Sequence, residues 1–175
     1  MGLSPVWRLR EVVPEEISLP EEVHKTGIQD MDWSRLKAKV AGCTDCKLRP
    51  GCTQTVFGVG DEKADWLLVG EAPGAEEDRL GEPFVGQAGR LLDNMLAAIE
   101  LNRGSNVYIA NVLKCRPPGN RNPEPDEVAK CSPHLLRQIG LIQPKLILAM
   151  GRFAAQTLLG TDATCLLYTS DAADE

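Results

Sequence analysis

The chain has 175 residues, of which 43% are hydrophobic and 25% are charged, a composition typical of one soluble globular domain. It has no run of 18 apolar residues and no apolar secretion signal at its start, so we exclude a membrane-spanning helix and expect a cytoplasmic protein. The net charge of −6 is unlike that of a strongly basic nucleic-acid binder, although the two ends, 1–32 and 161–175, each carry −4 and leave +2 for residues 33–160.

In chain order, residues 1–32 have scattered prolines and little apolar periodicity, which predicts a flexible N-terminal arm. Apolar residues at helical spacing predict a short helix at 33–41. Continuous apolar runs then predict three strands, at 65–70, 107–113 and 145–150. Apolar residues at helical spacing predict three helices, at 86–101, 125–139 (restarted at Pro133) and 151–160. This alternation predicts an α/β fold, a three-layer α/β/α sandwich with a central parallel sheet.

The end of the chain does not complete this sheet. Three strands are few for an α/β sandwich, and residues 161–175 show neither helical nor strand periodicity. This last segment resembles translated sequencing-adapter sequence. We therefore expect one domain over 33–160 that lacks its last strand, followed by a non-native tail over 161–175.

Four of the six cysteines have the spacing of a metal site. Cys43 and Cys46 form a CxxC pair, and Cys115 and Cys131 follow with fifteen residues between them. Four thiolates in this pattern can hold zinc or an iron–sulfur cluster, and the absence of a second CxxC or HxxxH pair favours iron–sulfur. The remaining cysteines and both histidines show no ligand spacing and are interpreted as ordinary side chains; these are Cys52, Cys165, His24 and His134.

Three further side chains could carry chemistry at the sheet edge. Glu71 follows the first strand, where α/β sheets bind ligands, and it either acts on a ligand or caps the next helix. The surrounding sequence has neither GxGxxG nor a P-loop lysine, which argues against a nucleotide phosphate site. Asn111 is either a satisfied buried amide or reads the edge of a planar base. Phe84, in a Gly-rich loop, either covers the core or stacks on a base.

Three motifs occur together in order: GEAPGAEED at 70–78, GEPFVGQAG at 81–89 and NVLKCRPP at 111–118. With matching segments at 53–60 and 131–160, they resemble the family 4 uracil-DNA glycosylases, the iron–sulfur members of the uracil-DNA glycosylase superfamily. The resemblance covers roughly residues 34–160. It implies the glycosylase fold and hydrolysis of the N-glycosidic bond of uracil in DNA, the first step of base excision repair, by a nucleoid-associated monomer.

The resemblance also implies roles for single residues. Glu71 would position or activate the attacking water, and the implied substrate-binding residues are Ala72, Glu77 (where a thymine methyl is excluded), Phe84 (stacking on uracil) and Asn111 (bonding its Watson–Crick edge). The implied ligands of a structural [4Fe–4S] cluster are Cys43, Cys46, Cys115 and Cys131. The cluster would also fix Arg116 and Arg121, which could contact DNA phosphates.

The chain departs from this family in one respect. Family members continue into a fourth strand and a His-Pro motif that contacts uracil, and no histidine follows His134 here. A catalytically impaired iron–sulfur or zinc DNA-binding fragment therefore stays open as an alternative, and an electron-transfer protein is a third hypothesis. Contact between the N-terminal arm and a replication clamp is a further hypothesis that no motif supports.

Overall fold

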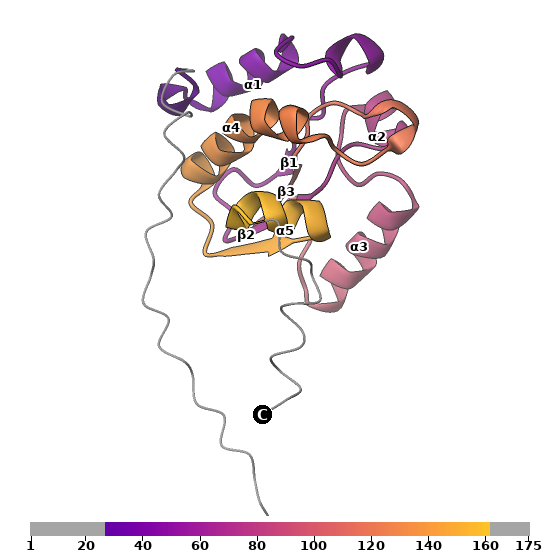
Figure 1. The fold of residues 1–175 in the computed structure, drawn as a ribbon. Helices are drawn as coiled ribbons and strands as arrows, with labels where there is room; N and C mark the ends of the chain where they lie inside the picture. The colour runs from indigo at the N-terminus through magenta and orange to yellow at the C-terminus, as the bar shows by residue number, and fades with distance from the viewer. Residues whose placement is uncertain (1–26, 162–175) are drawn as a thin grey trace, which may run out of the picture.

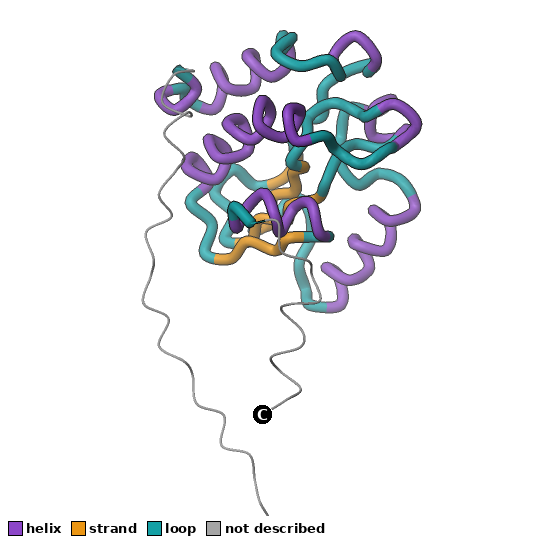
Figure 2. Tube along the Cα trace, viewed as in Figure 1, coloured by secondary structure: helices purple, strands orange, loops and turns teal. Residues whose placement is uncertain are grey.

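The computed structural model describes residues 27–161, and Figure 1 shows their arrangement. The helices are α1 (Trp33–Ala41), α2 (Ala75–Leu80), α3 (Gln87–Ala98), α4 (Pro125–Ile142) and α5 (Arg152–Leu159). The strands are β1 (Val59–Gly60), β2 (Trp66–Gly70), β3 (Val107–Asn111) and β4 (Leu146–Ala149). Long loops join α1 to the sheet and β3 to α4, and these loops carry much of the candidate site (Figure 2). Most of the expected arm and nearly all of the expected tail lie outside the described residues.

The four strands form one mixed sheet in the order β1-β3-β2-β4. β2 runs parallel to β3 and to β4, which confirms the three predicted strands and the α/β class. The expectation of a wholly parallel sheet was wrong at one edge, because β1 pairs antiparallel with β3. This strand has two residues, too few to show periodicity, and a Cβ on Gly60 would lie 2.2 Å from the Val107 carbonyl oxygen.

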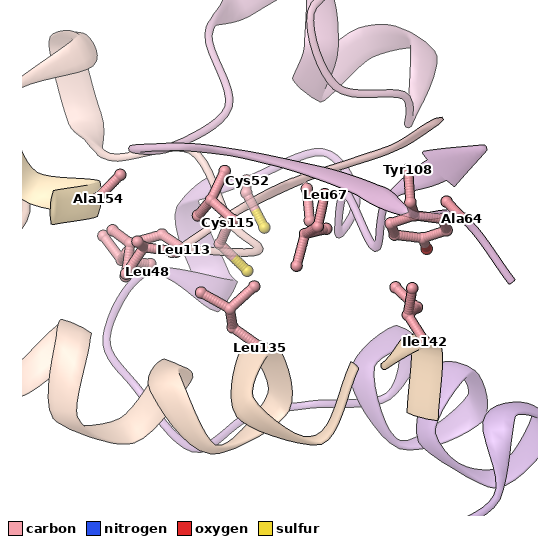
Figure 3. Close-up of a cluster of buried hydrophobic side chains, with 13 residues drawn as sticks. Leu48, Cys52, Ala64, Leu67, Tyr108, Leu113, Cys115, Leu135, Ile142 and Ala154 are labelled. Atoms are coloured by element: carbon pink, nitrogen blue, oxygen red, sulfur yellow. The ribbon is translucent and has the colours of Figure 1, made fainter. Parts of the chain in front are cut away.

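Helices cover both faces of the sheet. On one face, Leu67 and Tyr108 lie over Leu135 and Ile142 of α4, as Figure 3 shows, and α5 packs nearby. On the other face, Leu92 and Leu96 of α3 pack against alternate residues of β2 and β3. α1 contacts the outer side of α4 (Figure 1). The expected three-layer arrangement is therefore present.

The long helix α4 gives the site its framework. It continues through Pro133, so the expected restart of the helix at that residue was wrong. One buried face of this unbroken helix carries Glu127, Cys131, His134 and Gln138 at spacings of four, three and four residues. Residues at these spacings share one side of a helix, so the four polar groups face the same interior region.

Part of the expected arm is packed onto the domain. Residues 27–32 include a short 3-10 helix, Ile28–Asp30, in which Ile28 is buried against Leu36 and Phe57. Asp32 then caps α1 by accepting the N–H of Arg35 at 2.8 Å. Among residues 27–161, no helix has the length and apolar character needed to span a bilayer.

Candidate active site and metal pocket

The candidate base-reading residue lies at the carboxyl end of the sheet. Asn111 ends β3, pairs in register with Gly70 at the end of β2, and is 2% exposed. Its Oδ1 atom is buried and has no hydrogen-bond partner within the described part of the chain. Leaving a buried acceptor unpaired costs about 1–3 kcal/mol, so this oxygen is suited to a ligand that brings a donor.

Gly70 allows an aromatic ring to approach this amide. A Cβ at position 70 would lie 2.5 Å from Asn111 Oδ1 and 2.5 Å from Cζ of Phe84. The amide oxygen and the ring therefore lie so close to Gly70 that a side chain at this position would collide with both. The ring and the amide meet at this point, which is the combination that stacks on a planar base and bonds its edge.

Arg103 supports the loop that carries Phe84. Phe84 has a left-handed backbone, with φ of 54°, which an L-residue adopts at an energetic cost. The Arg103 guanidinium donates to the carbonyl oxygen of Pro83 at 2.7 Å, donates to that of Phe84, and pairs with Asp93 at 2.5 Å. It thus holds the peptide on both sides of the unusual residue.

Glu77 holds the same loop from its other side. One carboxylate oxygen accepts the N–H groups of Val85 and Gly86, each at 3.0 Å, and the other accepts that of Gly74 at 3.1 Å. Although burial acts to raise it, these main-chain bonds hold the pKa of Glu77 below its ordinary value. The carboxylate therefore stays ionised beside the Phe84 loop, and its implied exclusion of the thymine methyl stays a prediction.

Glu71 lies next to Gly70 at the same sheet edge. Its main-chain carbonyl accepts the N–H of Leu113 at 3.0 Å, and its carboxylate makes no hydrogen bond to another described residue. Burial raises the pKa of Glu71, opposed by the charge of Arg152 at the start of α5. Ala72 is partly buried and packs against the core beneath. α2 is capped by Gly74 and Glu77 instead of Glu71, and the predicted action of Glu71 on a ligand stays a prediction.

The four cysteines predicted to bind metal come together around one pocket. Cys43 and Cys46 follow α1, Cys115 follows β3, and Cys131 lies on α4; together they line one pocket. Burial raises the pKa values of Cys43, Cys115 and Cys131, that of Cys131 to about 11. Four thiols around one pocket can supply the ligands of an iron–sulfur cluster, and each ligating thiol would lose its proton.

Asp45 and His134 line the same pocket beside the cysteines. Cys43, Asp45 and His134 each present a ligand atom within 4.8 Å of the others, and Nε2 of His134 is buried with no partner among residues 27–161. The sequence does contain a signal for His134, because it lies three residues after Cys131 on one helix. Cys52 lies beside Cys115 above Leu135 (Figure 3). Cys165 and His24 lie outside the described residues.

Lys114 connects the pocket to the base-reading residue, and sequence reasoning missed it. Its main-chain N–H donates to Cys131 Sγ at 3.2 Å, and its ammonium Nζ donates to the Asn111 carbonyl oxygen at 2.9 Å and to Gln138 Oε1 at 2.7 Å. Burial lowers the pKa of Lys114 to about 8, opposed by the Cys131 thiol group. The only sequence signal was a lysine that directly follows an apolar strand and precedes a cysteine.

The two arginines expected near the cluster differ in their surroundings. Arg121 bonds both carboxylate oxygens of Glu127, at 2.9 and 2.6 Å, and Glu127 is fully buried. Arg116 bonds the neutral side chain of Asn120 at 2.7 Å. Arg121 is therefore ion-paired within the loop, whereas Arg116 has no carboxylate partner among residues 27–161, and the phosphate contacts expected of both stay a prediction.

Comparison with known proteins gives concordant matches. A family model of the Uracil DNA glycosylase superfamily matches residues 57–172. The Type-4 uracil-DNA glycosylase of Archaeoglobus fulgidus is 56% identical over 118 residues, which are 67% of this chain and 59% of that protein. That of Sulfurisphaera tokodaii is 48% identical over 122 residues, 70% of this chain and 56% of the relative. That of Pyrobaculum aerophilum is 44% identical over 129 residues, 74% of this chain and 65% of the relative. The chain thus spans 56% to 65% of the length of these relatives.

Proposed function

The chain belongs to the uracil-DNA glycosylase superfamily, as its motifs indicated, and on this basis we propose that it hydrolyses the N-glycosidic bond of uracil in DNA. This reaction is the first step of base excision repair. The observation that carries the proposal is the buried Oδ1 of Asn111, which has no hydrogen-bond partner among residues 27–161 and lies with the Phe84 ring against Gly70. The relatives named above support this proposal. The chain spans only part of their length, so its own activity is stated here as a proposal.

Binding requires that the base leaves the DNA stack. A base inside a duplex cannot reach a pocket at the edge of a sheet, so the nucleotide must be flipped or already single-stranded. In the pocket, Phe84 stacks on the base. Asn111 Oδ1 accepts the N3–H of uracil while the amide NH₂ group donates to the O4 oxygen. Cytosine has an unprotonated N3 at this place, so the acceptor Asn111 Oδ1 would face another acceptor. The site therefore disfavours cytosine.

Bond cleavage places opposite charges on the two products. The departing uracil gains negative charge, and the sugar gains positive charge. A carboxylate near the sugar stabilises that cation, and it also orients a water molecule for attack. We assign this role to Glu71. Its raised pKa makes it a stronger proton acceptor than an ordinary surface glutamate.

We further propose that Cys43, Cys46, Cys115 and Cys131 hold a [4Fe–4S] cluster, for which their convergence on one pocket is the support. When bound, such a cluster supplies covalent links between three segments that are distant in sequence. The cysteines would then tie the segment after α1 and helix α4 to the loop that follows Asn111. Metal binding would stabilise this loop and with it the base-reading amide.

The test uses a single-stranded oligonucleotide with one uracil, incubated with the full chain and then treated with alkali to reveal base loss. Release from the uracil oligonucleotide, none from a thymine counterpart, and loss of release in Asn111→Ala would support the proposal. Asn122→Ala, in the loop before α4, is the matched control. DNA binding without release would instead support the DNA-binding fragment. Analysis of iron, sulfide and zinc in the purified chain identifies the metal.

A further inference from the structure

Lys114 is an ammonium group fixed in the interior. The residue is 2% exposed, and its Nζ donates to two neutral oxygens, the Asn111 carbonyl at 2.9 Å and Gln138 Oε1 at 2.7 Å. Gln138 is itself oriented, because its Nε2 donates to the Phe57 carbonyl at 3.0 Å. The position of the ammonium is therefore determined from both sides.

No Asp or Glu among residues 27–161 forms an ion pair with Lys114. Buried charges in proteins are normally paired, since burying an isolated ion is costly. The acidic group in direct contact with Lys114 is the Cys131 thiol, whereas Asp45, another residue that lines the pocket, pairs with Lys39. The main-chain N–H of Lys114 bonds Cys131 Sγ at 3.2 Å, and Lys114 lines the four-cysteine pocket.

Metal binding would convert these thiols into thiolates. Four thiolates around an iron–sulfur core, or around zinc, leave a net negative charge in a largely buried pocket. A cation held at the rim of that pocket would offset part of it. The same cation bonds the main chain of Asn111, so it also lies between the metal and the base-reading amide.

We propose that Lys114 is a positioning residue: its ammonium is the counter-charge of the metal-bound cysteines and fixes the main chain of Asn111. The inference rests on the proposed function and adds to it a route by which the metal acts on base reading without touching the substrate. Loss of the metal would leave the ammonium uncompensated in the interior. The strand end at Asn111 would then loosen although the sheet stays folded.

The first experiment removes the charge and keeps the length of the side chain. Lys114→Met and the control Lys130→Met, an exposed lysine at the rim of the same pocket, are prepared as full chains with metal bound. We expect Lys114→Met to lose its metal to a chelator at least tenfold faster than wild type, and Lys130→Met to stay within twofold. With an iron–sulfur cluster bound, we also expect a more negative reduction potential in Lys114→Met, because removal of a nearby cation disfavours electron uptake.

The second experiment supplies a different counter-charge. Gln138→Glu places a carboxylate at the oxygen that Lys114 already bonds. Hydrogen exchange is followed at Val112 and Leu113, whose N–H groups donate to the carbonyl oxygens of Gly70 and Glu71. In wild type we expect metal removal to accelerate exchange there, and in Gln138→Glu we expect the metal-free chain to keep more of its protection. This measurement decides the question if Lys114→Met does not fold.

The outcomes separate the two proposals. Unchanged chelator half-life and potential in metal-loaded Lys114→Met would overturn the inference and leave the proposed function standing. Exchange in metal-free Gln138→Glu that is as fast as in the metal-free wild type would overturn the inference in the same way. A wild-type chain that binds neither iron nor zinc would overturn the proposed cofactor and, with it, the inference.

Discussion

Arg103→Ala tests how the stacking residue is held in place. The side chain is 21% exposed and supports the carbonyls on both sides of Phe84, and each bond from a charged donor contributes about 1.5–3 kcal/mol. Without it, the left-handed backbone of Phe84 is unfavourable by about 1–2 kcal/mol, so we expect the loop to relax. Base stacking on an aromatic ring contributes about 1–3 kcal/mol, which limits the loss to roughly 5- to 160-fold in kcat/KM.

The assay is uracil release from a single-stranded oligonucleotide by Arg103→Ala, Phe84→Ala and the double variant. Because Arg103 acts through Phe84, the double variant should lose no more activity than Phe84→Ala alone. Arg79→Ala is the control, since Arg79 is 65% exposed and pairs only locally with Glu76. Independent, additive losses in the double variant, or wild-type activity in Arg103→Ala, would refute this reasoning.

Three further predictions concern the pocket, the loop before α4 and the pH dependence. Gly70→Ala should reduce uracil release at least 100-fold, because its Cβ fills the space between ring and amide; circular dichroism should show the fold retained, and substantial activity would contradict the proposed pocket. Arg121→Ala should lower the free energy of unfolding in urea by about 1–3 kcal/mol, because buried Glu127 loses the guanidinium that bonds both of its carboxylate oxygens. Lys145→Ala, which removes an exposed ion pair with Asp65, should cost less than about 1 kcal/mol, and equal effects would argue against a special role for Arg121. Uracil release should fall as pH drops through the raised pKa of Glu71, above the ordinary 4.5, and Glu71→Gln should lack this acidic limb; an unchanged limb would assign it to another group.

The parts of the fold that sequence could predict are those with a local pattern. Residues 107–111 are buried on both faces of the sheet, and the strand was visible as a continuous apolar run. β1 was missed because its two residues are specified by a distant partner strand and by the lack of a Cβ at Gly60. Pro133 suggested a break that does not occur, since packing of α4 against the sheet outweighs the local preference of one residue.

The candidate site divides in the same way. Asn111, Phe84 and the cysteines could be named from motifs, although only the structure shows that the ring, amide and metal pocket adjoin. The supporting residues were missed because their partners are remote in sequence: Arg103 bonds a carbonyl 19 residues away, and Lys114 bonds a side chain 24 residues away. Such contacts leave no periodic signal in the chain, so they emerge only when the elements are packed together.

The first turn of α4 has a consequence for residues far along the helix. Glu127 accepts the N–H of Glu124 at 2.9 Å and thereby determines where the helix begins. Each residue of an α-helix is rotated by about 100° from the one before, so the starting point sets the rotational phase of every later side chain. A one-residue shift at this start would turn Cys131 and Gln138 away from the interior together. The capping carboxylate of Glu127 thus sets the orientation of the Cys131 thiol and of the Gln138 amide that bonds Lys114, further along the same helix.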